Sequence, residues 1–227
     1  MSNYRHENKY RIDSAEEMML RIKAEGAMGR DPYAGSRGFY YIRSLYFDDL
    51  DNNCVFDTES GVGLRSKFRM RYYNDDRGYV RLEKKSKITN LVIKESCLLN
   101  KIECDMLVRG EIPLIEPDMP EIKKKMFSEM QLRCLYPKVI VSYERIPFVY
   151  DVGNVRLTFD RNITSSDDTE FFLQGNYSMR PVMQQGYNIL EIKWNELLPI
   201  HIRDVMLLDS LCLVSFSKYC MCGRYHL

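Results

Sequence analysis

The chain has 227 residues, a length that fits one large domain or two small ones. Hydrophobic residues make up 45% of it, which is enough for a substantial core and excludes a wholly disordered protein. The 33 Lys and Arg residues nearly balance the 32 Asp and Glu residues, so the net charge is +1, which disfavours a protein that coats duplex nucleic acid.

The first half of the chain is predicted to contain mostly strands. The first strand lies near residues 4–12, where apolar and charged side chains alternate. A helix follows, because Ser14 and Glu17 form a capping-box pattern ahead of apolar residues, and it ends near Gly26. Further strands are predicted at residues 40–48, 66–74, 79–86 and 90–97.

The rest of the chain is predicted to hold three helices and three strands. Asn100 with Glu103 opens a short helix, and Pro120 precedes another that reaches Leu132. A wide apolar stripe predicts a last helix at about residues 199–219. The strands are expected at residues 138–150, 154–160 and 188–194.

Charged side chains share one face of several predicted strands, because residues i and i+2 of a strand point the same way. Lys67, Arg69 and Arg71, for example, alternate with apolar residues. The same alternation recurs in four other strands, at Arg5, Glu7, Lys9, Arg11, Arg81, Glu83, Lys85, Arg156, Thr158, Asp160, Glu191 and Lys193. One solvated face of an ordinary antiparallel sheet would also carry charges. Surface ion pairs stabilise a protein little, however, so a charged lumen explains the pattern better.

The sequence therefore predicts an α+β fold in which an antiparallel β-barrel of about eight strands encloses a charged lumen, with helices packed outside. No linker interrupts the chain, so we expect a single domain over residues 1–227. Arg and Lys converging from several walls suit a phosphate chain. Glu among them indicates Mg²⁺ or Mn²⁺, which bridges carboxylate and phosphate oxygens. Together these groups predict a site for metal-bound polyphosphate or a nucleoside triphosphate.

Eight motifs carry a resemblance to a known family, and they follow the family order along nearly the whole chain. They are RHENKY (5–10), SLYFD (44–48), KFRMRYY (67–73), LEKK (82–85), YER (143–145), VRLTFD (155–160), LEIK (190–193) and SFSKY (215–219). With them the chain resembles the VTC domain, the catalytic domain of polyphosphate polymerases. That family belongs to the triphosphate tunnel metalloenzymes of the CYTH-like superfamily.

The resemblance implies a role for each matching residue. Phosphates would be held in the tunnel by Lys9, Arg69, Arg71, Lys85, Lys94, Arg156, Lys193, Ser217 and Lys218. Among these, Arg69, Arg71 and Lys218 would act in catalysis together with Glu191. Glu191 would also be the principal ligand of Mn²⁺ or Mg²⁺, with Glu7 and Glu83 as further acidic groups. The family places a second Arg about a dozen residues after Arg156; Asp167 and Asp168 stand there, so that role stays unassigned.

The activity that the resemblance implies is a metal-dependent phosphotransferase that moves the γ-phosphate of ATP onto a growing polyphosphate chain. Such a reaction depends on positioning and charge stabilisation, so the lack of a Ser/His/Asp or Cys/His set is expected. Two alternatives stay open. One is a tripolyphosphatase or nucleoside triphosphatase of the same fold, and the other is a non-catalytic polyphosphate-binding module. Nucleic acid is not an expected partner.

The seven scattered cysteines are odd in number, which is typical of reduced thiols in a cytoplasmic protein. No apolar run is long enough to span a membrane, and the first residues lack a secretory signal. We therefore expect a cytoplasmic protein. The resemblance leaves a separate membrane protein open as a partner, and the sequence does not predict the oligomeric state.

Overall fold

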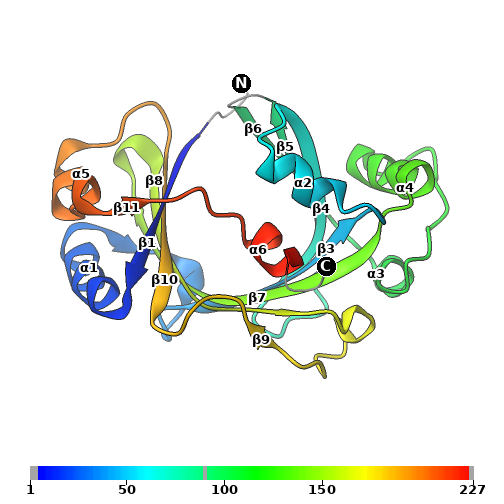
Figure 1. Cartoon of the computed structure of the whole chain (residues 1–227), viewed down its shortest axis with the longest axis horizontal. Helices are drawn as coiled ribbons and strands as arrows, with labels where there is room; N and C mark the ends of the chain where they lie inside the picture. Colours follow the sequence, from blue (N-terminus) through cyan, green and yellow to red (C-terminus); the bar gives the residue numbers. More distant parts are fainter. Residues whose placement is uncertain (1–4, 89–90, 225–227) are drawn as a thin grey trace. The chain divides into compact units, whose positions relative to one another are not determined.

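The computed structural model describes residues 5–88 and 91–224, and the predicted strands at 4–12 and 90–97 each begin on a residue outside this range (Figure 1). Two compact units make up the chain. Unit 1 comprises Met1–Tyr41, Tyr143–Ile163 and Met183–Phe216. Unit 2 comprises Ile42–Ser142, Thr164–Val182 and Ser217–Leu227. The single domain expected over residues 1–227 stays a prediction.

Unit 1 contains an antiparallel sheet with the strand order β11-β1-β10-β8, and β2 pairs with β7. Its strands are β1 (His6–Asp13), β2 (Gly29–Arg30), β10 (Tyr187–Trp194), β11 (Cys212–Leu213) and parts of β7 (Tyr136–Tyr150) and β8 (Val155–Ser166). Its helical segments are α1 (Ser14–Ala27), η1 (Pro32–Ala34), η2 (Val152–Asn154), α5 (Ile200–Val205) and η4 (Leu208–Ser210).

The helices of unit 1 cover the apolar face of its sheet, and in Figure 1 α1 and α5 lie on the same side of β1. Leu157 and Phe159 of β8 lie in one buried cluster with Leu190 and Ile192 of β10. Helix α1 contributes Leu20 and Ala24 to this cluster, and α5 contributes Ile202. The charged side chains that alternate with the strand residues are thereby left on the opposite face.

The start of α1 lies one residue before the predicted position. Asp13, not Ser14, is the N-cap, because its Oδ1 accepts from the backbone N–H of Glu16 at 2.8 Å. Glu16 Oε2 in turn accepts from the N–H of Asp13 at 2.8 Å, which completes the capping box. Glu17 is thereby free to turn inward, where it accepts from Asn188 Nδ2 at 2.6 Å.

Unit 2 contains a second antiparallel run with the strand order β3-β4-β5-β6, and β9 pairs with β8. Its strands are β3 (Tyr40–Asp48, mainly in this unit), β4 (Leu64–Tyr73), β5 (Arg81–Ile88), β6 (Leu91–Leu98), β9 (Arg180–Pro181) and the remaining parts of β7 and β8. Its helical segments are α2 (Asn53–Glu59), α3 (Lys101–Val108), α4 (Glu121–Arg133), η3 (Thr169–Phe171) and α6 (Lys218–Arg224).

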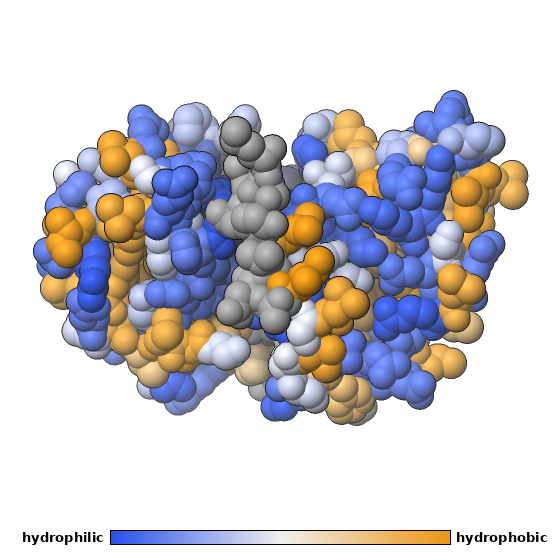
Figure 2. Space-filling model, turned by 90° about the horizontal axis from the view of Figure 1, so that it is seen from above, coloured by the Kyte–Doolittle hydropathy of each residue, from blue (hydrophilic) through white to orange (hydrophobic). Residues whose placement is uncertain are grey.

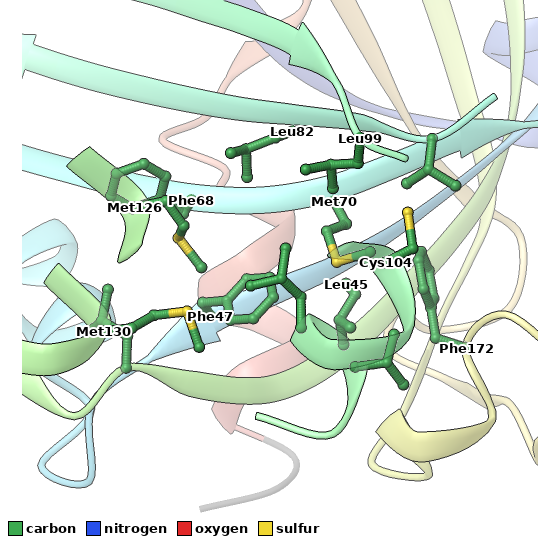
Figure 3. Close-up of a cluster of buried hydrophobic side chains, with 14 of the residues drawn as sticks. Leu45, Phe47, Phe68, Met70, Leu82, Leu99, Cys104, Met126, Met130 and Phe172 are labelled. Carbon is green, nitrogen blue, oxygen red and sulfur yellow. The ribbon is translucent and has the colours of Figure 1, made fainter. Parts of the chain in front are cut away.

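The core of unit 2 lies between one face of its strands and the helices α3 and α4. Figure 3 shows Phe68 and Met70 of β4 in this cluster with Met126 and Met130 of α4. Leu82 of β5 also belongs to the cluster, and its neighbours Arg81 and Glu83 point to the other face. The expectation that helices cover the apolar strand faces is therefore met within each unit.

The predicted last helix at residues 199–219 is wrong. Helix α5 ends at Val205, and Leu207 takes a left-handed conformation with φ of 51°. Cys212 and Leu213 then form β11, which pairs with Tyr10 and Arg11 of β1. An apolar stripe cannot reveal this, because the backbone groups of β11 are satisfied by a strand about 200 residues away in the chain.

The α+β class with an antiparallel sheet is confirmed, and most of the other predicted strands and helices agree with observed elements to within a few residues. The strand predicted at 154–160 continues to Ser166. The hydrogen-bonded strands of each unit form an open run, so neither unit forms by itself the closed barrel of about eight strands that we expected. Helices α2 and α6 and the two-residue strands β2, β9 and β11 were not predicted.

Candidate functional site

Surface hydropathy does not mark a site, because hydrophobic and hydrophilic residues are interspersed on the face seen in Figure 2. Strand register does. Residues directly opposite each other on antiparallel strands share a face. In unit 1 the opposed pairs are Glu7–Lys193, Lys9–Glu191, Arg156–Lys193 and Thr158–Glu191. Unit 1 therefore gathers on one face all five of the predicted site residues that belong to it.

The ammonium group of Lys193 lies between the two carboxylates that we predicted as metal ligands in this unit. Its Nζ is 3.2 Å from Glu7 Oε1 and forms a close ion pair with Glu191 Oε1. Lys9 Nζ lies 3.9 Å from the same Glu7 oxygen and donates to the carbonyl of Phe216 at 2.9 Å. The two carboxylates thus converge on the position of one cation.

Arg145 and Asp160 lie beside Glu191 and were not among the predicted site residues. Arg145 donates to both oxygens of Asp160, from Nε at 2.6 Å and from Nη2 at 2.7 Å. Its Nη2 is also 3.9 Å from Glu191 Oε2. Burial would lower the pKa of Arg145, but Asp160 holds that pKa well above its usual value. The signals were present, since Arg145 belongs to the YER motif and Asp160 alternates with Arg156 and Thr158.

Arg156 and Thr158 each have one buried polar atom without a hydrogen-bond partner among the described residues, Nε in Arg156 and Oγ1 in Thr158. Arg156 Nη2 donates to Asp31 Oδ2 at 3.0 Å and to the Tyr40 hydroxyl at 2.7 Å, which fixes the guanidinium at the end of the sheet. Thr158 is only 3% exposed, and its Oγ1 has no hydrogen-bond partner among the residues that the structure describes. A buried hydroxyl without a partner is unusual in a folded protein.

The register of unit 2 builds a second charged face from four rungs of opposed residues. The rungs are Ser44–Arg71–Arg81, Tyr46–Arg69–Glu83–Ser96, Lys67–Lys85–Lys94 and Arg65–Lys87. They include the predicted phosphate-binding residues Arg69, Arg71, Lys85 and Lys94. Glu83 is the one carboxylate in these rungs, and the other charged side chains are all Arg or Lys. Charge is therefore sorted differently in the two units, because the unit 1 face carries acids and bases in similar number.

Glu83 organises the two arginines of this face. Its Oε2 accepts from Arg69 Nε at 2.7 Å and lies 3.7 Å from Arg71 Nη1, while its Oε1 is 2.6 Å from Lys94 Nζ. Burial would raise the pKa of Glu83, but Arg71, Arg69 and Lys94 hold it far below its usual range. Glu83 therefore stays ionised and fixes these cations side by side.

The hydroxyls of Ser44 and Tyr46 hold the same arginines from the other strand. Ser44 Oγ accepts from Arg71 Nε at 2.9 Å, and the Tyr46 hydroxyl accepts from Arg69 Nη1 at 2.8 Å. Burial would raise the pKa of Tyr46, but Arg69 and Arg71 hold it below its usual value. Sequence reasoning missed this role, although both residues belong to the SLYFD motif.

Ser217 and Lys218 lie at the start of α6, rather than at the end of a long helix. Ser217 Oγ is 3.5 Å from Lys67 Nζ, which lies 5.0 Å above the ring of Tyr219. The Tyr219 hydroxyl donates to Asp48 Oδ2 in a close hydrogen bond. Asp48 and Tyr219 thereby hold the first turn of α6 against the charged face of unit 2.

The predicted metal ligands divide between the units, with Glu7 and Glu191 in unit 1 and Glu83 in unit 2. Within the described ranges, no three His, Cys, Asp or Glu side chains form a group that could hold a metal ion. A cation at Glu7 and Glu191 would thus need further oxygen ligands from a substrate. All seven cysteines are free thiols.

The VTC domain family model matches residues 4–226. Two solved structures share the fold with TM-scores of 0.55. One is a candidate adenylate cyclase from Bacillus halodurans, with 15% identity over 96% of each chain. The other is HpAC1 from Hippeastrum, a candidate adenylyl cyclase with a dominant triphosphatase activity, with 12% identity over 98% of this chain and 97% of that chain. At these identities the likeness shows the fold alone, and it agrees with the CYTH-like fold expected from the motifs.

No curated protein matches the sequence. None of the helices in the described part of the chain has the length and apolar character needed to cross a membrane. The cytoplasmic location stays a prediction.

Proposed function

Because the chain belongs to the VTC domain family, we propose that it is a polyphosphate polymerase, which transfers the γ-phosphate of ATP to the end of a growing polyphosphate chain. The observation that best supports this is the register of unit 1. It places two carboxylates, Glu7 and Glu191, on one sheet face with the cations Lys9, Arg156 and Lys193. Carboxylates for a metal and cations for phosphates are the groups that phosphoryl transfer requires.

The residues of unit 1 fit Mg²⁺ or Mn²⁺. Carboxylate oxygens are the ligands that these hard cations prefer, and Mg²⁺ usually takes one or two carboxylates together with substrate phosphates. We propose Glu191 and Glu7 as the ligands, since both already contact one cation, the ammonium of Lys193. The metal would neutralise charge that develops on the phosphate oxygens. Lys193 and Lys9 lie on the same face and would bind the phosphates around it.

The charged face of unit 2 would bind phosphate groups and keep them aligned for transfer. Arg69 and Arg71 are already fixed by Glu83, Tyr46 and Ser44, so little side-chain entropy would be lost when they bind phosphate oxygens. Further phosphate contacts would come from Lys85, Lys94, Ser217 and Lys218. The predicted metal role of Glu83 stays a prediction. Its two oxygens contact Arg69 and Lys94, so a metal ion would have to replace these cations.

The direct test is to incubate the purified protein with ATP and Mn²⁺ and to separate the products on a polyphosphate gel. We expect chains longer than three phosphates from the wild-type protein. Arg71→Ala and Glu191→Gln should abolish them, because the first removes a fixed phosphate-binding cation and the second a metal ligand. Glu116→Gln, which neutralises an exposed carboxylate in a loop, is the matched control and should behave as wild type.

The same experiment separates the alternatives. Release of free phosphate without chain growth would show a tripolyphosphatase or nucleoside triphosphatase and contradict the polymerase. Equal binding of polyphosphate with and without divalent metal, together with no turnover, would show a non-catalytic binding module. The hydrolase is the stronger alternative, because the same cations and carboxylates could bind the substrate when water, rather than polyphosphate, accepts the phosphoryl group.

A further inference from the structure

Thr158 carries a buried hydroxyl on the charged face of unit 1, and the proposed function assigns it no role. It lies in β8 directly opposite Glu191 of β10, so the two side chains share a face and their Cβ atoms are about 5 Å apart. Thr158 is 3% exposed, and its Oγ1 has no hydrogen-bond partner among the described residues. The other threonine of β8 is satisfied, since Thr164 Oγ1 donates to the carbonyl of Ser142 at 3.4 Å. The unpaired hydroxyl of Thr158 therefore needs an explanation.

Lys193 occupies the position between the two carboxylates that we propose as metal ligands. Its ammonium group makes a close ion pair with Glu191 Oε1 and lies 3.2 Å from Glu7 Oε1. A divalent cation held by both carboxylates requires this position, so the ammonium group must leave it. Glu191 is only 5% exposed, and a carboxylate that binds a metal normally also accepts a hydrogen bond that fixes its orientation. With Lys193 displaced, Glu191 needs a donor from elsewhere in the site.

Two other cations near Glu191 already have acceptors. Lys9 opposes Glu191 on β1, and its Nζ donates to a main-chain carbonyl at 2.9 Å. Arg145 donates to both oxygens of Asp160, and its Nη2 is 3.9 Å from Glu191 Oε2, which is longer than a hydrogen bond. The hydroxyl of Thr158 differs from both, because it opposes Glu191 and makes no hydrogen bond within the described ranges.

We propose that Thr158 is a positioning residue for the metal site, whose hydroxyl donates to Glu191 once a divalent cation has replaced the ammonium group of Lys193. This inference rests on the proposed function. In the metal-free protein Lys193 already fixes Glu191, and the hydroxyl makes no contact that its removal would break. A positioning role therefore predicts a variant that is as stable as wild type but binds the metal-loaded substrate more weakly. A merely structural role would not give this combination.

The test is titration calorimetry of the purified protein with a non-hydrolysable ATP analogue, once in Mn²⁺ and once in EDTA. Thr158→Val removes the hydroxyl and keeps the shape of the side chain. In Mn²⁺ its Kd should be about tenfold higher than that of wild type, as is usual when a metal ligand loses its hydrogen-bond partner, and in EDTA the Kd should not change. Thr158→Ser keeps the hydroxyl and should bind as wild type does in both conditions. The matched control, Thr164→Val, makes the same change at a hydroxyl that already has an acceptor, and it should also bind normally.

Urea denaturation without metal gives the second readout, and Thr158→Val should be at least as stable as wild type. Thr158→Ala removes the hydroxyl with a different change in volume, and it should show the same loss of affinity in Mn²⁺. An unchanged Kd in Mn²⁺, a less stable Val variant, or an equal loss in Mn²⁺ and in EDTA would overturn the inference. The last result would mean that the hydroxyl contacts the nucleotide itself. If Mn²⁺ did not strengthen binding to the wild-type protein, the proposed metal-dependent function would fail.

Discussion

At the scale of single residues, the site combines side chains that make several hydrogen bonds with side chains that have a buried polar atom without a partner among the described residues. Arg69, Arg71 and Arg145 each make several charge-assisted hydrogen bonds or ion pairs, and these fix their positions. Thr158 lies on the same face as Glu191, is buried, and lacks a hydrogen-bond partner in the part of the chain that is described. A buried polar group left in this state costs about 1–3 kcal/mol, so the fold tolerates it at the expense of stability.

Thr158→Val should therefore leave the free energy of unfolding unchanged or raise it by about 1 kcal/mol, because it replaces an unpaired hydroxyl with a methyl group of similar shape. Urea denaturation of the two proteins measures this. Thr158→Ser, which keeps the hydroxyl, should not show the gain. A loss of about 1 kcal/mol or more in the Val variant would mean that the hydroxyl has a partner, such as an ordered water.

At the scale of elements, a buried ion pair joins α3 to α4 in unit 2. Lys123 Nζ lies 2.6 and 2.7 Å from the two oxygens of Glu103. Glu103 also closes the capping box of α3, since its Oε2 accepts from the N–H of Asn100 at 2.8 Å. One carboxylate therefore fixes both the start of α3 and its contact with α4, the two helices that cover the apolar face behind the charged rungs.

Lys123→Met should lower the free energy of unfolding by about 3 kcal/mol, because it leaves the buried carboxylate of Glu103 without its cation. Lys101→Met, at an exposed position of α3, should cost less than about 0.5 kcal/mol. The double variant Glu103→Gln/Lys123→Met should recover part of the loss. Chemical denaturation measures all three, and a Lys123→Met variant as stable as wild type would contradict the argument.

At the scale of the whole molecule, a net charge of +1 conceals strong sorting. The unit 2 face is almost wholly basic, and Glu83 holds two of its arginines, Arg69 and Arg71. Because the pKa of Glu83 is lower in the folded than in the unfolded protein, its contribution to stability is complete above the unfolded value of about 4.3. That contribution is lost progressively as the pH falls below this value towards the folded pKa.

Glu83→Gln should consequently be less stable than wild type at pH 7, by about 3 kcal/mol, because the buried Arg71 and the partly buried Arg69 lose their carboxylate. Its stability should also depend less on pH than that of wild type between pH 5 and pH 3. Denaturation curves at a series of pH values measure both effects, and Glu116→Gln is the control for a general loss of negative charge. Equal pH dependence in the variant and wild type would contradict the assignment.

Alternation along the strands was sufficient to predict the charged faces, and together with the capping patterns and apolar stripes of the helices it predicted the α+β class. Side-chain direction in a strand has a period of two residues, so Lys67, Arg69 and Arg71 must share a face wherever the strand is placed. The motifs likewise led to the family. These features are local, because they depend only on neighbouring residues.

Contacts between distant segments decided the rest. Lys193 contacts Glu7 because β1 and β10 pair in one register, and a shift of one residue would turn Glu7 to the other face of the sheet. Arg145 of β7 donates to Asp160 of β8, a contact that depends on how these two strands are placed. Residues 212–213 form a strand because they pair with the edge of β1. Pairing between distant strands is selected by the total burial and hydrogen bonding of the sheet, which a local sequence pattern does not contain.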